Sequence, residues 1–189
     1  MHTTAVLCHP YEKSFNHAIL QTVRRCAEAR GDHFSLIDLY ADGFQPAMSR
    51  EELAVYMEGR SPDPLVSRYN KILKDTDEAV LIFPIWWYDM PAMLRGFFDK
   101  VMLPKDAYTG AEIGLSPLRS IPKTRIFTTS SALTDHLVEI FGDPVGSIMI
   151  PHTLRMVGFH GCEWHNLGGI DSSTPAQRRE FLENVKEWI

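Results

Sequence analysis

One segment, residues 79–102, most constrains what this chain can fold into. It opens with a continuous apolar run, 79–83, which is typical of a short strand buried on both faces. Pro84 cannot donate a backbone hydrogen bond and ends the strand, and three aromatic residues follow at 86–88. Pro91 suits the first turn of a helix, and apolar residues then recur at helical spacing. The segment therefore predicts a strand, an aromatic loop and a helix. Its loop lies at the carboxyl end of the strand, where open α/β sheets bind ligands.

The rest of the chain alternates between strand and helix patterns. Apolar and β-branched runs predict four further strands, at 3–8, 34–39, 124–129 and 157–163. Capping residues, prolines and helical spacing predict helices at 15–29, 49–58, 63–74, 91–102, 134–141, 144–156 and from Thr174 onward. This alternation predicts βαβ units and a mainly parallel sheet. Residues 103–122 show no period, and a loop of this length is expected to be functional or engaged with a partner.

Composition argues against several classes of protein. The 189 residues fit one domain, 1–189, and a net charge of −5 argues against nucleic-acid binding. No apolar stretch reaches the length of a membrane span, and the first 15 residues lack a signal-peptide pattern. Cys8, Cys26 and Cys162 are odd in number and widely spaced, which indicates a reduced, cytoplasmic location. No metal site is expected, because no set of histidines, cysteines or carboxylates has matched ligand spacing.

Two loops should carry the chemistry. In the doubly wound strand order 2-1-3-4-5, the loops 9–14 and 84–90 flank the point where the order reverses. The first loop lacks the glycine-rich nucleotide fingerprints, but Ser14 and Asn16 at a helix N-terminus suit a phosphate, and His9 can add a donor. Two alternatives stay open: Ser14 is only a helix cap, and His9 makes only a structural hydrogen bond.

Trp86 and Trp87 indicate a planar ligand. Successive side chains of an extended segment alternate in direction, so both tryptophans cannot point inward. At least one should face the crevice at the sheet edge, where it can stack on a planar ring. The alternative is an oligomer interface, which is compatible with ring stacking.

The chain carries an ordered set of short motifs: His9 with Ser14-Phe15-Asn16 and Ala18; Asp38-Leu39-Tyr40; Ser61-Pro62-Asp63; Phe83-Pro84 through Trp87-Tyr88 to Pro91-Ala92; Lys105-Asp106-Ala107-Tyr108-Thr109; Thr128-Thr129; and Thr174-Pro175-Ala176. With this set the chain resembles the flavodoxin-like NAD(P)H:quinone reductases, the DT-diaphorase family, over almost its whole length. The resemblance implies a flavodoxin-like α/β fold: a doubly wound, five-stranded parallel sheet with helices on both faces. It also implies a homodimer with two flavin sites at the subunit interface.

The resemblance assigns site residues by position. The phosphate side of the flavin would be held by His9, Phe15, Asn16 and Ala18, beside Ser14. The ring would lie along Pro84, Ile85, Trp86, Trp87 and Tyr88, with Thr128, Thr129, Ser130 and Ser131 at its other edge. Arg179 matches a position near the adenylate of FAD, which favours FAD over the alternative FMN. Tyr108 would reach into the neighbouring subunit's substrate pocket, which places the excursion 103–122 at the dimer interface.

Two departures from the family concern the ring edge and the proton relay. The family's usual Gly-Gly is Ser130-Ser131 here, and serine lacks the freedom of glycine to adopt positive φ. The tyrosine and histidine that relay charge in the family have no clear counterparts. His136 is the only titratable aromatic residue between positions 132 and 141, and it is the candidate for that relay. Tyr108, in the substrate pocket, is the other catalytic candidate that the resemblance implies.

The resemblance thus implies an oxidoreductase that passes hydride from NAD(P)H through bound flavin to a quinone or similar planar acceptor. Two alternatives stay open. One is a flavodoxin-like electron carrier, although carriers tend to be markedly acidic and −5 is a modest charge. The other is a regulatory flavoprotein subunit of a potassium efflux system.

Overall fold

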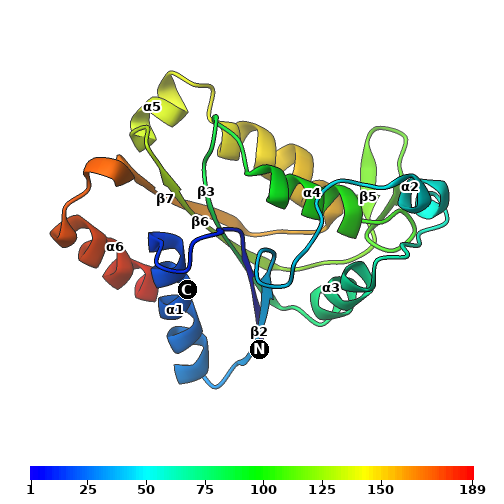
Figure 1. The fold of residues 1–189 in the computed structure, drawn as a ribbon, viewed down its shortest axis with the longest axis horizontal. Helices are drawn as coiled ribbons and strands as arrows, with labels where there is room; N and C mark the ends of the chain where they lie inside the picture. The colour runs from blue at the N-terminus through cyan, green and yellow to red at the C-terminus, as the bar shows by residue number, and fades with distance from the viewer.

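The computed structural model describes residues 1–189 and contains a central sheet of five parallel strands (Figure 1). These strands are β1 (His2–Leu7), β2 (His33–Asp38), β3 (Glu78–Pro84), β6 (Lys123–Ser130) and β7 (Cys162–Gly168). Their order is β2-β1-β3-β6-β7, which confirms the predicted doubly wound arrangement. Leu7 lies beside Ile82, and Ile82 lies beside Phe127. The three central strands therefore bring their carboxyl ends to one edge of the sheet.

Helices cover both faces of this sheet, with α1 and α6 on one face and α3, α4 and η1 on the other (Figure 1). The helical elements are α1 (Phe15–Ala29), α2 (Arg50–Tyr56), α3 (Pro64–Lys74), α4 (Ala92–Val101), α5 (Thr134–Glu139), η1 (Pro144–Leu154), η2 (Arg155–Val157), η3 (Ile170–Ser172) and α6 (Pro175–Trp188). Every residue of β3 is buried. Burial on two faces explains why this strand reads as an unbroken apolar run instead of an alternating one.

Helix starts coincide with the predicted capping residues. The Ser14 hydroxyl accepts the His17 N–H at the start of α1, and the Asp63 carboxylate accepts the Leu65 N–H at the start of α3. Reciprocal capping boxes open two other helices, between Ser49 and Glu52 in α2 and between Thr174 and Gln177 in α6. These are local interactions, and local sequence predicts them well.

The fifth strand was predicted at 157–163, and this prediction is wrong. The strand is β7, Cys162–Gly168. Gly158 and Gly161 have φ values of 91° and 54°, left-handed angles that cannot continue a strand. A Cβ on Gly158 would lie 2.1 Å from the Arg119 carbonyl oxygen, so glycine is required where the two segments touch. The strand begins only after this turn.

Two other segments differ in detail from expectation. The helix predicted at 144–156 is the π-helix η1 followed by the short 3₁₀-helix η2, and Pro151 within η1 cannot donate a backbone hydrogen bond. The excursion 103–122 contains an antiparallel hairpin of β4 (Tyr108–Gly110) and β5 (Leu115–Pro117). No helix is both long enough and apolar enough to cross a membrane.

Candidate functional site

The candidate site lies where β1, β3 and β6 end, at the reversal point of the strand order. Three segments leave the sheet there: 8–14, 85–91 and 131–133. They are neighbours because β3 pairs with both β1 and β6 in parallel register. Backbone hydrogen bonds tie the segments together, from the Cys8 N–H to the Ile82 carbonyl and from the Ile85 N–H to the Thr129 carbonyl at 2.7 Å.

A mostly apolar cavity of about 470 Å³ opens between the second and third segments. We call it the aromatic crevice, and it is lined by Ile85, Trp86, Trp87, Tyr88, Ser130, Ser131, Ala132 and Leu137. The sequence predicted the first six of these residues. Its size and its aromatic wall suit a planar ring system with part of the ring exposed.

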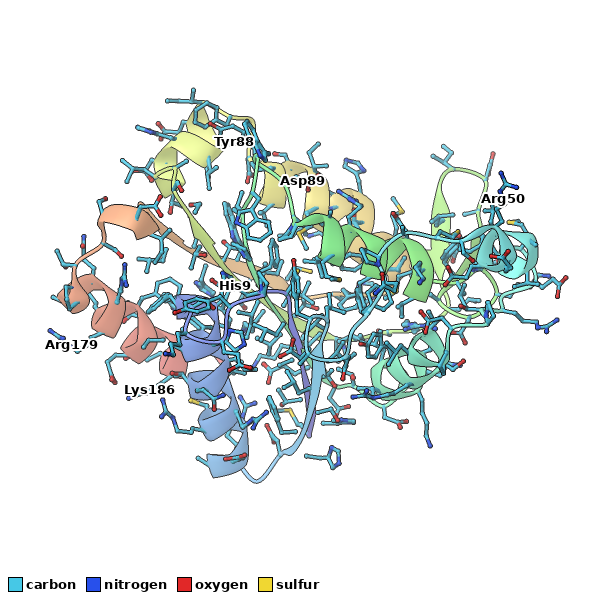
Figure 2. All side chains as sticks on the ribbon, in the orientation of Figure 1. His9, Arg50, Tyr88, Asp89, Arg179 and Lys186 are labelled. Atoms are coloured by element: carbon cyan, nitrogen blue, oxygen red, sulfur yellow. The ribbon has the colours of Figure 1, made fainter.

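The aromatic wall is a tight turn. Trp86 and Asp89 exchange two backbone hydrogen bonds, at 3.0 and 3.1 Å. Both residues between them, Trp87 and Tyr88, have positive φ, 52° and 62°, as the central residues of a type I′ turn do. Glycine or asparagine is the usual choice in such turns. Figure 2 shows Tyr88 and Asp89 together at this end of the molecule. The Trp87 side chain is 95% exposed, while the Tyr88 ring packs on Phe141 with centroids 4.4 Å apart.

Asn16 lies at the first turn of α1, on the phosphate side of the predicted site. Its side chain is buried, and its Oδ1 accepts a hydrogen bond from the Thr129 hydroxyl at 2.9 Å. Its Nδ2 donor has no partner within the chain. An unpaired buried donor is costly, and the first N–H groups of a helix also lack intrahelical partners. These donors fit an anionic oxygen such as that of a phosphate.

His9 is half-buried between Trp86 and His17, with ring centroids 6.3 Å from each. Its Nδ1 accepts the Tyr11 N–H at 3.0 Å, so the neutral ring carries its proton on Nε2. Burial, with the nearby His17 as a smaller contribution, lowers the pKa of His9 from its ordinary value. His9 is therefore a neutral Nε2–H donor at pH 7.

Two of the predicted ring-edge residues have their side chains engaged elsewhere. The Thr128 hydroxyl donates to Asn166 and accepts from the Trp164 indole, each at 2.8 Å. The Ser130 hydroxyl donates to the Ala132 carbonyl and accepts from Asn166. Only backbone groups of these residues remain for a ligand. Neither Ser130 nor Ser131 has a positive φ, so the backbone here does not require the glycines of the family.

The remaining predicted residues lie apart from the aromatic crevice. Phe15 packs on Phe181 of α6, with centroids 6.0 Å apart, in the core beneath α1. Tyr108 donates to or accepts from the Tyr56 hydroxyl at 2.9 Å and lines a separate cavity of about 190 Å³. His136 is exposed on α5 and does not line the crevice. Arg179 is exposed on α6, and Figure 2 shows it far from Tyr88.

The whole chain, residues 1–189, matches the model of a family described as having a flavodoxin-like fold. The chain belongs to this family. It is 26% identical over 188 residues to a Haemophilus influenzae protein described as an uncharacterized NAD(P)H oxidoreductase, a match that covers 97% of this chain and 91% of that protein. It is also 26% identical to rat NAD(P)H dehydrogenase (quinone) 1, over 96% of this chain and 74% of that protein. The solved NAD(P)H:quinone oxidoreductase of Methanothermobacter marburgensis superposes with a TM-score of 0.87 at 25% identity, covering 99% of this chain and 97% of that one.

Sequence reasoning missed several residues that shape this flavodoxin-like site. Leu137 closes the crevice, Phe141 supports Tyr88, and Asn166 of β7 holds the hydroxyls of Thr128 and Ser130. No local pattern marks them, because each acts through contacts between distant segments. A correct position for β7 was the one signal that would have placed Asn166 beside Thr128.

Proposed function

We propose that this protein is a flavin-dependent NAD(P)H oxidoreductase that reduces a quinone or a similar planar acceptor. The observation that carries the proposal is the aromatic crevice at the reversal point of a flavodoxin-like sheet, next to unpaired donors at the start of α1. The relatives named as NAD(P)H oxidoreductase and NAD(P)H dehydrogenase (quinone) match nearly the whole chain. Fold alone does not determine activity, and here the site and the relatives agree.

Asn16 and the first backbone N–H groups of α1 would hold the flavin phosphate, with Ser14 and Ala18 beside them. The backbone of Pro84 and Ile85 and the turn at 86–88 would lie along the ring. Thr129 would meet the phosphate side through its hydrogen bond to Asn16, while Thr128, Ser130 and Ser131 would offer backbone groups to the ring edge. Bound flavin supplies hydride transfer from nicotinamide to the acceptor. Phe15 supports this wall from the core.

The chain's own residues would orient the reactants and exclude water. Trp86, Trp87 and Tyr88 give a planar, apolar surface on which nicotinamide and acceptor rings can stack. The His9 ring lies beside Trp86 with its Nδ1 occupied by the Tyr11 N–H, so Nε2–H is its free donor, and burial favours the neutral ring by lowering its pKa. We assign no role to His136, because it is exposed and outside the crevice.

We infer that the working unit is a homodimer. The excursion 103–122 presents exposed apolar side chains, with Ile113 91% exposed and Leu118 52% exposed, and Trp87 is exposed on the crevice. Several large apolar side chains exposed within one short segment favour contact with a partner, whereas singly scattered ones do not. Within one chain Tyr108 lines a different cavity from Trp87, so contact of Tyr108 with a crevice ligand requires a second copy. Ile113→Asp should convert the dimer to a monomer in sedimentation velocity, and a monomeric native protein would refute the inference.

FAD is the proposed flavin, with FMN as the alternative. Arg179 supports FAD, because it is exposed without an ion pair on α6 and matches the family position near the adenylate. A cytoplasmic location is proposed from the three free cysteines, which suit a reducing compartment. Chromatography of the flavin released on denaturation decides between FAD and FMN directly.

The proposed activity is tested by rapid anaerobic mixing of the flavin-loaded protein with NADH or NADPH. The flavin absorbance near its visible maximum should bleach, and a quinone added next should restore it. A flavodoxin-like electron carrier would bind flavin without bleaching, since it has no nicotinamide site. Protein that neither carries flavin nor binds added flavin would overturn the proposal.

A further inference from the structure

A second cavity, of about 500 Å³, lies along α3 and shares no residue with the aromatic crevice. We call it the basic cavity, and its polar lining includes Arg60, Ser61, Ser67, Lys71, Lys74 and Asp106. Three of these side chains are cationic and one is anionic, although the whole chain carries a net charge of −5. The cavity is therefore a local reversal of the protein's overall charge.

Two loops in close backbone contact form one wall of the basic cavity. Gly59 has a φ of 77°, and a Cβ at this position would lie 2.5 Å from the Pro104 carbonyl oxygen. No other residue fits there without movement of the backbone. Lys105, the next residue, also has a positive φ, 64°, and its Cβ would be 3.5 Å from a Gly59 Cβ. This contact brings the Cβ of Lys105, a fourth cationic residue, next to Gly59 in the cavity wall.

The cations around the basic cavity outnumber the two carboxylates that pair with them, of which one is Glu58, paired with Arg60 at 2.9 Å, and the other is Asp106. Asp106 forms ion pairs with both Lys74, at 2.5 Å, and Arg119, at 2.9 Å. Arg119 is almost fully buried beneath the cavity, donates to Asn70 at 2.6 Å, and leaves its Nε and Nη1 donors without partners. Lys105 donates its backbone N–H to the Tyr108 carbonyl oxygen, but the ammonium groups of Lys71 and Lys105 form no ion pair and no hydrogen bond within the chain. Uncompensated positive charge in a concave, partly desolvated site attracts anions more strongly than the same charge on an open surface.

We propose that the basic cavity binds a small anion that carries a phosphate group. Lysine ammonium groups act as point charges for phosphate, and Lys71 and Lys74 stand one helical turn apart on the same side of α3. The Ser61 hydroxyl accepts the Asp63 N–H and keeps its own proton to donate, and the Ser67 hydroxyl makes no hydrogen bond within the chain. The oxygens of the phosphate can therefore pair with the ammonium groups and accept hydrogen bonds from the hydroxyls. The ordinary alternative is a solvated lysine-rich helix face.

Calorimetric titration with inorganic pyrophosphate distinguishes an anion site from a solvated helix face. The protein is used as purified, with its flavin, in a buffer of low ionic strength. Flavin in the crevice keeps the donors at the start of α1 from competing. Lys71→Gln and Lys74→Gln should each weaken pyrophosphate binding by about tenfold, and Lys71→Arg should restore it. Lys186→Gln is the matched control, because Lys186 is half exposed on α6, remote from α3, and its loss changes the net charge equally (Figures 1 and 2).

The result expected is weakening by the α3 variants alone, with thermal unfolding midpoints unchanged because Lys71 and Lys74 are exposed. Three results would overturn the proposal. The first is the absence of binding heat at millimolar pyrophosphate. The second is equal weakening by Lys186→Gln, which would mean that only net charge matters. The third is binding that persists unchanged in Lys71→Gln and Lys74→Gln, which would place the anion elsewhere. Hydride-transfer activity is not part of the readout, so failure of the proposed enzymatic function leaves this test intact.

Discussion

Trp87 and Tyr88 occupy a backbone conformation that large aromatic residues rarely adopt. The left-handed region costs a residue with a side chain roughly 1–2 kcal/mol relative to its preferred conformations. Strain of this size persists where the surrounding structure enforces it, and it clusters at binding sites. Here the two backbone hydrogen bonds between Trp86 and Asp89 close the turn, and Arg95 forms an ion pair with the Asp89 carboxylate at 3.2 Å. The turn therefore holds two aromatic side chains at the crevice, and their strained backbone lowers the stability of the folded protein.

The first prediction separates this strain from packing. Trp87→Gly should raise the free energy of unfolding by about 1 kcal/mol relative to Trp87→Ala, because only glycine adopts positive φ without cost. Trp87 is 95% exposed, so both variants lose little packing. Urea denaturation of the flavin-free protein measures the difference. Equal stability of the two variants would show that position 87 is not strained.

Helices α2, α3 and α4 meet at one buried ammonium group. Lys100 of α4 is 3% exposed and forms ion pairs with Glu52 of α2 at 2.8 Å and with Asp63, the cap of α3, at 3.1 Å. It donates hydrogen bonds to the Asp63 carboxylate and to the Gln45 carbonyl oxygen, the latter at 2.7 Å, and it lies 4.9 Å from the centre of the Phe44 ring. Two carboxylates and one carbonyl oxygen therefore surround this ammonium group. The Lys100 side chain thus attaches segment 44–63 to helix α4.

The second prediction is that Lys100→Met destabilises the protein by about 3 kcal/mol, because two largely buried carboxylates lose their cation. Chemical denaturation provides the measurement. Lys186→Met is the control, since its pair with Glu183 is exposed on both sides and should change stability by less than about 1 kcal/mol. Similar losses in the two variants would contradict a structural role for the buried ammonium group.

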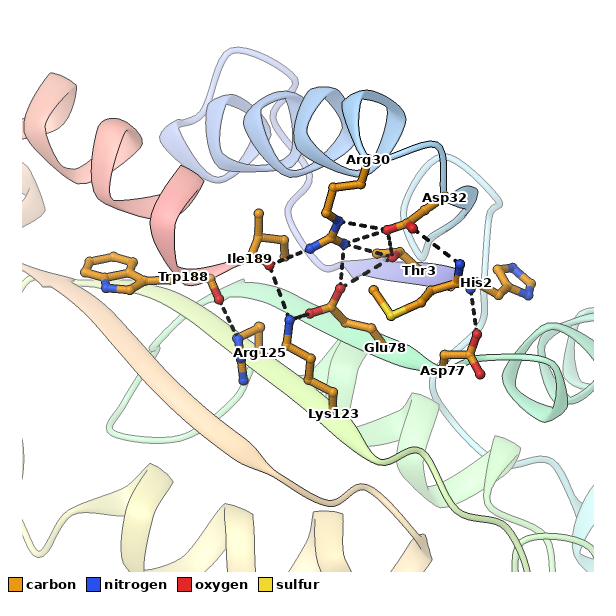
Figure 3. A network of polar contacts seen from close by, with 11 residues as sticks. His2, Thr3, Arg30, Asp32, Asp77, Glu78, Lys123, Arg125, Trp188 and Ile189 are labelled. Atoms are coloured by element: carbon orange, nitrogen blue, oxygen red, sulfur yellow. Dashed lines mark hydrogen bonds and ion pairs between the residues drawn. The ribbon is translucent and has the colours of Figure 1, made fainter.

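A polar network at the opposite end of the sheet from the crevice ties distant parts of the molecule together (Figure 3). The fully buried Glu78 of β3 pairs with Arg30 at 2.7 Å and with Lys123 at 2.6 Å. Both cations also donate to the Ile189 carbonyl oxygen, and Arg30 pairs with Asp32. The network joins β1, β3, β6 and the segments that follow α1 and α6. It therefore fixes the relative positions of the three strands from which the crevice loops leave the sheet.

The third prediction concerns acid stability. Burial tends to raise the pKa of Asp32, but hydrogen bonds from Arg30 and Thr3 overcome it and lower that pKa below the ordinary value of 3.8. The folded-state pKa is thus below the unfolded one, so Asp32 stabilises the protein fully above pH 3.8 and loses this effect as the pH falls through the folded-state pKa. Asp32→Asn should lower the free energy of unfolding at pH 7, and the gap to the native protein should narrow below about pH 4.

Urea denaturation at a series of pH values measures the gap. Asp171→Asn serves as the control, because Asp171 is exposed in η3 and makes no ion pair. A gap for Asp32→Asn that stays constant from pH 7 to pH 3 would contradict the assignment.

The sequence by itself determined the alternating elements, their capping residues and the aromatic exit from β3. These features depend on neighbours within a few positions, such as the apolar run 79–83 and the Ser14 cap, so local chemistry specifies them. It also placed Trp86, Trp87 and Tyr88 at the carboxyl edge of the sheet, because parallel strands end together.

Only the tertiary structure decided which of the candidate groups remain free for a ligand. Asn166 and Trp164 of β7 form hydrogen bonds with the Thr128 hydroxyl. The predicted position of this strand begins five residues too early, so the sequence did not predict these hydrogen bonds. Thr129 takes one side of the Asn16 amide and leaves the other unpaired. Hydrogen bonds between residues far apart in sequence depend on the packing of whole elements, and single-residue preferences carry no information about that packing.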